Sequence, residues 1–285
     1  MKDVTNAMRA HILTAAVPYI KQYTDQYVVV KYGGNAMIDE ELKKSVMKDL
    51  MLLQLVGVKV VLVHGGGPAI NNTLDAMKIE SRFANGLRVT DEATMDVVQM
   101  VLAGKVNKGL VADLTELGGK AVGLCGVDGN MIQVHKQNDE LGYVGSIDTI
   151  DTSIIDDVIS RGYIPVISSI GMGADGKTYN INADTVAAKI AGALKAETMV
   201  AMTNIDGVLK DVHDPESLIS KITMAEAEQL KVDGIIAGGM IPKVDCCLEA
   251  IEAGAQKVFI INGEIPHAIL IELLTDEGLG TMFVA

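Results

Sequence analysis

The sequence predicts an α/β protein whose core is an open, mostly parallel β-sheet sandwiched between helices. Short apolar runs alternate with helical segments along most of the 285 residues, which is the order of elements that produces such a sheet. Each run is apolar throughout, as expected of strands that are buried on both faces. The 29 glycines against 6 prolines further indicate many tight strand-to-helix turns. A chain of this length can form one large domain or two lobes.

The expected boundaries follow from these patterns. Strands are expected at residues 27–31, 59–64, 121–124, 164–168, 199–203 and 257–261. Helices are expected at residues 38–56, 69–77, 91–103, 105–117, 151–161, 184–194, 224–231 and 240–253. Residues 131–147 mix polar and apolar side chains and could form a hairpin.

Residues 1–22 precede the first strand and form a separate element. Val4, Met8 and Ile12 recur every four residues, with Leu13 close by, which predicts an amphipathic helix. Such a helix either packs on its own domain or acts as an arm that docks on another subunit. The pattern alone does not separate these two arrangements.

Charge and composition argue against several classes of protein. The formal net charge of −13 speaks against nucleic acid or an anionic membrane as the main partner. No apolar run reaches transmembrane length, and the N-terminus lacks an apolar segment followed by a small-residue cleavage site. Cys125, Cys246 and Cys247 show no CxxC or Cys/His metal spacing. We therefore expect a cytoplasmic protein with reduced thiols.

Glycine-rich loops follow three of the expected strands. Lys31 stands at the end of the first strand and is followed by Gly33 and Gly34, so the backbone and a cation can approach a phosphate there. Gly65–Gly67 precede a helix, whose free N–H groups suit an anion. Residues 204–207 follow a later strand. In parallel sheets these loops share one edge, where ligands bind. The sequence therefore predicts an anion-binding site at that edge.

Four polar residues beside turns or helix starts are further candidates. Arg88 follows a glycine turn and suits a carboxylate, although a lone arginine is usually a surface charge. Asn180 and Asp184 precede a helix and could simply be caps. Lys243 follows a glycine pair and could reach phosphates from a closing loop, or it could be solvated.

Six motifs taken together resemble the amino-acid kinase family. They are, in chain order, VKYGGNAM, LVHGGGPAI, NGLRVTD, YNINADTVA, TNIDGVL and GGMIPKV, and the resemblance extends from about residue 27 to the end. KxGG, HGGG and the TNxxGV loop recur across the wider family, whereas NGLRVTD, NxNAD and GGMxxK are specific to its acetylglutamate branch. The resemblance implies the amino-acid kinase fold in two lobes. Residues 1–22 would be a regulatory arm, residues 23–197 the acetylglutamate lobe and residues 198–285 the nucleotide lobe.

The resemblance implies transfer of the γ-phosphoryl group of ATP to the side-chain carboxylate of N-acetyl-L-glutamate, an early step of arginine biosynthesis. Lys31 and Lys243 would flank the transferred group, and Asp184 would hold both ammonium groups. The residues expected to bind the substrate are Gly66, Gly67, Arg88 and Asn180. Those expected at the nucleotide are Gly33, Gly34, Thr203, Asn204, Asp206, Gly207, Gly239 and Met240. Mg²⁺ would accompany ATP, held mainly by phosphates and water.

The N-terminal helix and the last residues resemble the arginine-inhibited members of that branch. In these, the N-terminal helices join three dimers into a hexamer, and L-arginine binds between this helix and a C-terminal segment. His267, Glu272 and Gly280 are the candidate arginine contacts, unless residues 266–285 are only a terminal helix and strand. Some relatives also bind a PII-type signalling protein, and the sequence does not decide that point.

Rival functions fit the motifs less well. Other kinases of the family, acting on aspartate, glutamate, carbamate or uridylate, fit NGLRVTD and NxNAD poorly. A non-catalytic amino-acid sensor would not need Lys31, Asp184 and Lys243 together. A dinucleotide-binding dehydrogenase would need a GxGxxG motif after the first strand, and none occurs there.

Overall fold

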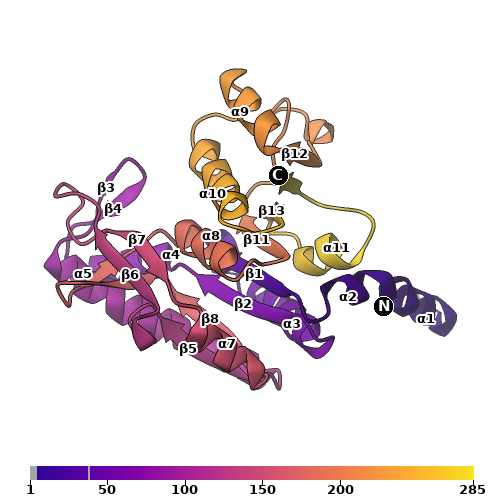
Figure 1. Ribbon diagram of the computed structural model, residues 1–285, viewed down its shortest axis with the longest axis horizontal. Coiled ribbons are helices and arrows are strands. Elements are labelled where there is room, and N and C mark those ends of the chain that lie inside the picture. The colour runs from indigo at the N-terminus through magenta and orange to yellow at the C-terminus, as the bar shows by residue number, and fades with distance from the viewer. Residues whose placement is uncertain (1–4, 38) are drawn as a thin grey trace.

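The computed structural model describes residues 5–37 and 39–285, and its centre is one eight-stranded sheet (Figure 1). Across the sheet the strands are β12 (Lys221–Thr223), β14 (Thr281–Val284), β13 (Lys257–Asn262), β11 (Thr198–Thr203), β1 (Tyr27–Tyr32), β2 (Lys59–His64), β8 (Ile164–Ser168) and β5 (Ala121–Cys125). All neighbouring pairs are parallel except β13 and β14. The predicted open, mostly parallel sheet is confirmed, and all the predicted strands belong to it.

Helices cover both faces of this sheet. One face packs against α7 (Ser153–Ser160), α8 (Ala183–Ala193) and α10 (Met240–Glu252), with α9 (Met224–Val232) beyond them. The other face packs against α3 (Glu40–Leu55), α6 (Asn107–Glu116) and α11 (Ala268–Leu274). Within β1, Val29 joins the first core while Val28 and Val30 join the second. This alternation inside a continuously apolar strand is what burial on both faces requires.

A smaller antiparallel layer stands beside the main sheet. It contains β10 (Thr178–Asn180), β9 (Ile170–Gly173), β6 (Ile132–Lys136) and β7 (Gly145–Ile150), in that spatial order. The hairpin expected within residues 131–147 is confirmed as β6 and β7. A second hairpin joins β3 (Arg82–Ala84) to β4 (Leu87–Val89) through Asn85 and Gly86, both at positive φ. Asn-Gly is the residue pair that such two-residue turns favour.

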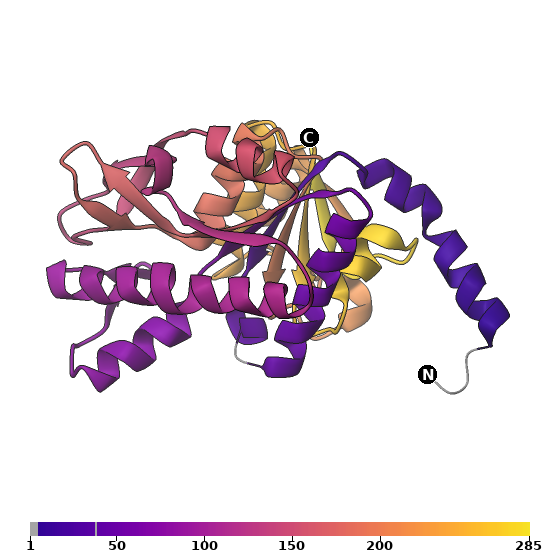
Figure 2. The same cartoon turned by 90° about the horizontal axis from the view of Figure 1, so that it is seen from below.

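The segments expected as two helices at 91–103 and 105–117 form one continuous rod, seen lengthwise in Figure 2. It runs from α5 (Glu92–Gln99) through a π-helical stretch (Met100–Val106) into α6. Gly104, which separates the two expected ranges, lies inside the π-helical stretch. The remaining helix, α4 (Gly67–Ala76), follows β2. Short 3₁₀ turns occupy Gly34–Met37, Asp128–Asn130 and Pro215–Ser217.

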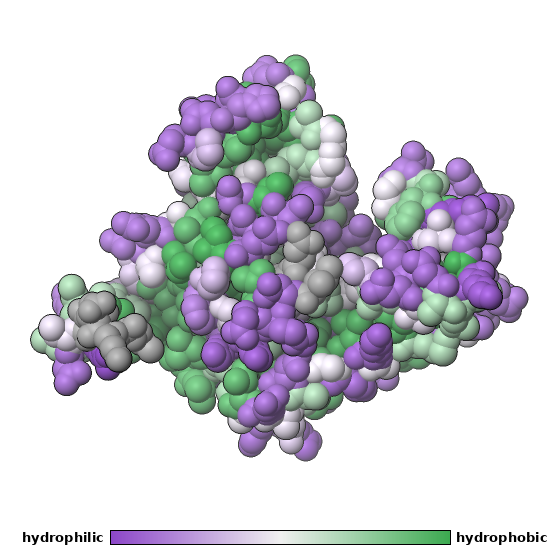
Figure 3. Space-filling model, turned by 180° about the vertical axis from the view of Figure 1, so that it is seen from behind, coloured by the Kyte–Doolittle hydropathy of each residue, from purple (hydrophilic) through white to green (hydrophobic). Residues whose placement is uncertain are grey.

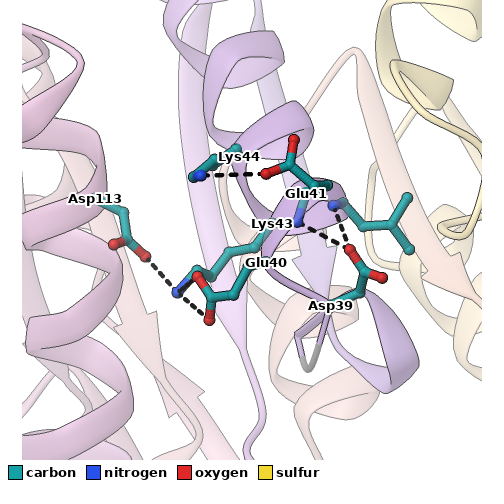
Figure 4. Close-up of polar contacts among 7 residues, drawn as sticks. Asp39, Glu40, Glu41, Lys43, Lys44 and Asp113 are labelled. Atoms are coloured by element: carbon teal, nitrogen blue, oxygen red, sulfur yellow. Dashed lines mark hydrogen bonds and ion pairs between the residues drawn. The ribbon is translucent and has the colours of Figure 1, made fainter.

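The start of α3 is tied to α6, as Figure 4 shows. The Asp39 carboxylate caps α3 by accepting hydrogen bonds from the amides of Glu41 and Leu42. Lys43 Nζ lies 2.9 Å from a Glu40 oxygen and 3.3 Å from Asp113 Oδ2 of α6. These contacts hold the end of the loop that follows β1 against the body of the protein.

The N-terminal arm consists of two helices, α1 (Asn6–Ala15) and α2 (Val17–Tyr23), with Pro18 in the first turn of the second. No residue of α1 is buried, and Leu13 is 72 % exposed. The arm projects from the body in Figure 2 and stands at the left edge of Figure 3. Helix α2 contacts α11 of the body, and its Tyr23 is buried in the core. Of the two arrangements expected for the N-terminal helix, packing on its own domain is therefore wrong for α1. Val4, which belongs to the predicted apolar row, lies outside the described residues.

Candidate active site

A cavity of about 300 Å³ opens at the carboxyl ends of β1 and β2. Figure 3 shows the molecule hollowed between the projection that carries α9 and the one that carries the β3–β4 hairpin. Eight of the predicted site residues line the cavity, namely Lys31, Gly33, Gly34, Gly66, Gly67, Arg88, Asn180 and Asp184. They come from segments that are far apart in the sequence, so the fold assembles them as the sheet topology predicted.

The centre of the cavity holds an ion pair between Lys31 and Asp184. Lys31 Nζ lies 2.9 Å from Asp184 Oδ1, and Lys31 is only 8 % exposed. Asp184 stands in the first turn of α8, which Asn182 caps by accepting a hydrogen bond from the Asp184 amide at 2.7 Å. A Cβ at Gly33 would stand 3.1 Å from Lys31 Nζ, so glycine leaves room for the ammonium group. The ammonium thus reaches the cavity at a fixed place.

The loop Gly65–Gly67 forms the second wall. Gly67 begins α4, whose first-turn N–H groups have no partner within the helix. Gly66 is a packing requirement as well, because a Cβ there would come within 2.6 Å of Leu102 Cδ2. Leu102 belongs to the π-helical stretch and also lines the cavity. Nothing in the sequence near Leu102 signalled this contact, since it arises only from tertiary packing.

Arg88 forms the far end of the cavity. Its guanidinium donates hydrogen bonds to Ser81 Oγ and, at 2.7 Å, to Asn71 Oδ1, and it lies 4.7 Å from the Phe83 ring centroid. Arg88 is 7 % exposed, and this burial lowers the pKa of the guanidinium from its ordinary value. A lone surface charge is therefore the wrong description of this residue. Its position suits one end of an anionic ligand.

Asn180 lies at the end of β10, on the opposite wall. Its Nδ2 donates a hydrogen bond to Thr90 Oγ1 at 3.3 Å, and its amide N–H donates to the Tyr143 carbonyl. Asn180 is thus not the cap of α8, since Asn182 fills that position. Its side chain remains available at the cavity wall.

The remaining nucleotide candidates lie outside the cavity lining but at the same sheet edge. Thr203 ends β11, the strand beside β1, and its Oγ1 accepts a hydrogen bond from the Ile205 amide. Asp206 Oδ1 accepts one from Asn262 Nδ2 at 2.8 Å, while Asn204 is exposed. A Cβ at Gly207 would stand 2.5 Å from Thr281 Oγ1. The loop is therefore shaped by its neighbours in β13 and β14.

The glycine pair before α10 carries Lys243 toward this edge without placing it in the cavity lining. Gly239 caps α10, Met240 begins the helix, and Gly238 has φ +54°. Within the described residues, Asp184 forms an ion pair with Lys31 and none with Lys243. The expectation that Asp184 holds both ammonium groups is met for Lys31 alone.

His64 was part of a quoted motif but received no role from the sequence. It is fully buried at the end of β2, with Nδ1 2.8 Å from the Gly65 carbonyl oxygen and Nε2 3.0 Å from Asn107 Nδ2. The NH₂ group of Asn107 can only donate a hydrogen bond, so Nε2 of His64 accepts it and Nδ1 carries the proton. Burial lowers the pKa of His64 to about 4. The ring is therefore neutral near pH 7.

The candidate arginine residues lie in or beside α11. His267 precedes α11 at φ 61°, and its Nδ1 lies 2.6 Å from Asp49 Oδ1. Glu272 Oε2 accepts hydrogen bonds from the amides of Leu279 and Gly280, and burial raises the pKa of this carboxyl. A Cβ at Gly280 would stand 2.0 Å from the Ile260 carbonyl oxygen. Helix α2 of the arm contacts this same helix α11.

Other groups make poor candidates. Cys125, Cys246 and Cys247 are free thiols, and burial raises the pKa of Cys246 to about 11. In the described ranges, no group of three or more His, Cys, Asp or Glu side chains is arranged to hold a metal ion. None of the described helices is long and apolar enough to pass through a lipid bilayer.

Comparison with known proteins adds a family and several relatives. Residues 26–262 match the model of the amino acid kinase family. The chain is 52 % identical to the acetylglutamate kinase of Brachyspira hyodysenteriae, over 99 % of each chain. It is 51 % identical to that of Nostoc punctiforme, over 98 % of this chain and 94 % of the other.

Solved structures share the fold. N-acetylglutamate synthase from Neisseria gonorrhoeae, complexed with coenzyme A and N-acetyl-glutamate, superposes with a TM-score of 0.84 and 27 % identity. The match covers 97 % of this chain and 63 % of that synthase chain, so this chain spans less than two thirds of its length. Carbamate kinase from Giardia lamblia has a TM-score of 0.64 at 18 % identity, over 91 % of this chain and 98 % of the other.

Proposed function

The chain belongs to the amino acid kinase family, and from this premise we propose that it is an acetylglutamate kinase. The reaction is transfer of the γ-phosphoryl group of ATP to the side-chain carboxylate of N-acetyl-L-glutamate in arginine biosynthesis. The relatives that carry this name are about half identical to the chain over nearly its whole length. Residues 23–197 serve as the acetylglutamate lobe, and residues 198–285 serve as the nucleotide lobe.

One observation carries the proposal: the Lys31–Asp184 pair faces the glycine loop across a cavity that ends at Arg88. The acceptor is a carboxylate, already ionised near pH 7, so the reaction needs no general base. Its barrier is largely the repulsion between two anions and their alignment, which fixed cations and N–H donors lower. Asp184 is the one carboxylate among the lining residues that the structure describes, and Lys31 neutralises it.

The two ends of the cavity then have separate roles. Arg88 and Asn180 bind the α-carboxylate end of acetylglutamate, while Gly66 and Gly67 donate N–H groups to the substrate nearer its side-chain carboxylate. Lys31 stabilises the transferring phosphoryl group from the other side. This division is supported by the burial of Arg88, whose guanidinium is held in place by Asn71 and Ser81.

ATP binds along the edge formed by Gly33, Gly34 and the loop 203–207, with Gly239 and Met240 near its phosphates. When bound with ATP, Mg²⁺ would be held mainly by the phosphates and water and would supply charge neutralisation there. Lys243 reaches the phosphates when the glycine-hinged segment before α10 closes. The exposed Gly238 and Gly239, with no atom near the place of a Cβ, leave that segment free to move.

We also propose feedback inhibition by L-arginine in a homohexamer built as a trimer of dimers. The exposed apolar face of α1, with Met8, Ile12 and Leu13, suits burial against a second copy of the chain. Arginine binds between the arm and the α11 segment, where Glu272 offers a half-buried carboxylate beside Gly280. The free thiols fit the reducing cytoplasm.

The decisive assay measures the acyl phosphate product. ATP, Mg²⁺ and N-acetyl-L-glutamate are supplied with hydroxylamine, which traps an acyl phosphate as a hydroxamate, and plain L-glutamate serves as the matched control substrate. Hydroxamate from the acetylated substrate alone is expected. Product from L-glutamate at an equal rate, or from neither substrate, would refute the proposed activity.

The regulatory part is tested separately. Arginine is expected to suppress hydroxamate formation by the full chain and to lose this effect when residues 1–22 are deleted. Light scattering should show the deletion variant as a smaller oligomer. Unchanged inhibition after the deletion would refute the proposed site.

A further inference from the structure

A fixed network of hydrogen bonds lies directly beneath the glycine loop. His64 Nδ1 donates to the Gly65 carbonyl oxygen at 2.8 Å. Asn107 Nδ2 lies 3.0 Å from His64 Nε2, 2.8 Å from the Val166 carbonyl oxygen and 3.3 Å from that of Leu124. The two hydrogens of this amide group are thus shared among three acceptors, and all of its donor capacity is used.

This network joins the loop to three strands of the main sheet. Val166 belongs to β8, Leu124 to β5 and His64 to β2, while Asn107 begins α6. His64 and Asn107 are 0 % and 1 % exposed. A buried side chain with all of its polar atoms bonded has one orientation, so the imidazole is held rigidly.

The bond to the Gly65 carbonyl also sets the direction of the next amide. No described peptide bond is cis, and in a trans peptide the C=O of one residue and the N–H of the next point in opposite directions. The Gly65 carbonyl faces the buried ring, so the Gly66 N–H points away from it, toward the cavity that Gly66 lines. No described residue accepts a hydrogen bond from this amide.

We propose that His64 and Asn107 are positioning residues that aim the Gly66 N–H at the anionic substrate, through a single imidazole tautomer. The inference rests on the proposed function, because it assigns the Gly66 amide to the carboxylate that is phosphorylated or to the phosphoryl group that it accepts. Neither residue touches the substrate. A preorganised donor of this kind accounts for rate differences on the order of 10²–10³.

Two substitutions of His64 distinguish a role in orienting the Gly66 N–H from a role in packing alone. In His64→Asn the side-chain NH₂ can occupy the place of Nδ1 and keep donating to the Gly65 carbonyl. In His64→Gln the amide reaches the place of Nε2 and keeps the contact with Asn107, but the donor to Gly65 is lost. Glutamine fills more of the volume of histidine, so a role in packing alone predicts that His64→Gln is the better enzyme.

The positioning role predicts the reverse order. Hydroxamate assays should give His64→Asn a kcat within about tenfold of the wild type and His64→Gln a loss on the order of 10²–10³, while the KM for ATP stays unchanged in both. Leu114→Val, two turns further along α6 and fully buried, is the matched packing control and should keep its kcat. Equal activity of the two His64 variants, or a better His64→Gln, would overturn the proposal.

Asn107→Asp tests the tautomer through pH. The carboxylate of Asp at this position can only accept a hydrogen bond, so it favours a proton on Nε2 of His64. At lower pH the ring can carry protons on both nitrogens and still donate to the Gly65 carbonyl. At higher pH the ring keeps only the proton on Nε2, and the Gly65 carbonyl loses its donor. Activity of Asn107→Asp relative to the wild type should therefore fall as pH rises from 6 to 8.5. A ratio that is flat with pH would contradict the mechanism.

One readout is independent of activity. Imidazole ¹⁵N spectra of the full chain, with the His64 signals assigned from their absence in His64→Asn, should show Nδ1 protonated and no titration between pH 5.5 and 8. A proton on Nε2, or a titration near pH 6.5, would refute the proposed positioning even if the kinase activity is confirmed. If the wild type makes no hydroxamate, the proposed function fails, and these spectra still decide the state of His64.

Discussion

Removing the charge of Lys31 should separate catalysis from stability. Lys31→Met keeps most of the buried stem but deletes the ammonium group that lies 2.9 Å from Asp184 Oδ1. If this group stabilises the transferring phosphoryl, kcat should fall on the order of 10²–10³, equivalent to about 3–4 kcal/mol in the barrier. The hydroxamate assay measures this loss directly.

The effect on folding should be smaller. At an effective dielectric constant of about 20, the gross attraction between the two charges is about 6 kcal/mol, and the desolvation of both groups offsets most of it. Asp184 keeps a side chain that is 23 % exposed, in the first turn of α8, where an anion is favoured. We therefore expect Lys31→Met to lose about 1–2 kcal/mol of unfolding free energy in urea titrations.

Two further variants make this argument refutable. Lys243→Met should lose as much kcat but change stability by less than about 0.5 kcal/mol, because Lys243 has no ion pair in the described structure. Lys31→Met combined with Asp184→Asn should regain stability, since no unpaired charge remains, and should stay inactive. A Lys31→Met variant with kcat within about threefold of the wild type would refute the role of Lys31.

Three other predictions concern separate parts of the chain. In Arg88→Lys the ammonium group cannot keep the hydrogen bonds to Ser81 and Asn71 and also bind a carboxylate. The KM for N-acetyl-L-glutamate should therefore rise about tenfold or more, while the KM for ATP changes little. Equal shifts in the two KM values would contradict the role assigned to Arg88. Burial raises the pKa of Asp49 from 3.8 to about 6, so this carboxyl contributes stability below pH 3.8 that is lost as pH rises through 6. Asp49→Asn should therefore be more stable than the wild type at pH 7.5, by up to about 3 kcal/mol, and the gap in thermal unfolding should close toward pH 4; a gap independent of pH would count against it. Gly280→Ala places a methyl group 2.0 Å from the Ile260 carbonyl oxygen and should lower the free energy of unfolding by about 1–3 kcal/mol. A decrease below about 0.5 kcal/mol would contradict this prediction and show that the C-terminal segment shifts to make room for the methyl group.

Six strands of the main sheet were predictable because each is a continuous apolar run with clear turn signals, whereas β12 and β14 were not predicted. The segments that the sequence analysis missed are short and carry weak signals. β9 reads Ile-Gly-Met-Gly, and β10 has three residues, so neither shows a period that a pattern can reveal. The π-helical stretch Met100–Val106 was equally hidden; its Leu102 packs against Gly66, a contact that the local sequence does not signal.

The site was predictable to the extent that it depends on topology. Lys31 stands near the end of β1 and Gly65–Gly67 follow the neighbouring parallel strand β2, so their meeting at one edge needed no structure. The burial of Arg88 was not predictable, because Asn71 of α4, Ser81 and Phe83 surround it only in the folded protein. His64 was hidden for the same reason, since its partner Asn107 is 43 residues away.

The chain is acidic overall, yet it can bind the proposed anionic substrates because the local charge in the cavity is positive. The protein carries a formal charge of −13, yet Lys31 and Arg88 both reach the cavity, and the first turns of α4 and α8 line it. The first-turn N–H groups of α4 and the positive end of the α8 dipole add positive partial charge without adding any mobile side chain. Charges elsewhere on the surface are screened beyond a Debye length of about 8 Å at physiological salt, whereas the groups in the cavity act over a few ångströms. Because backbone amides supply much of this field, their aim matters as much as the lysine charge, and this is why the ring beneath Gly65 deserves to be tested beside Lys31.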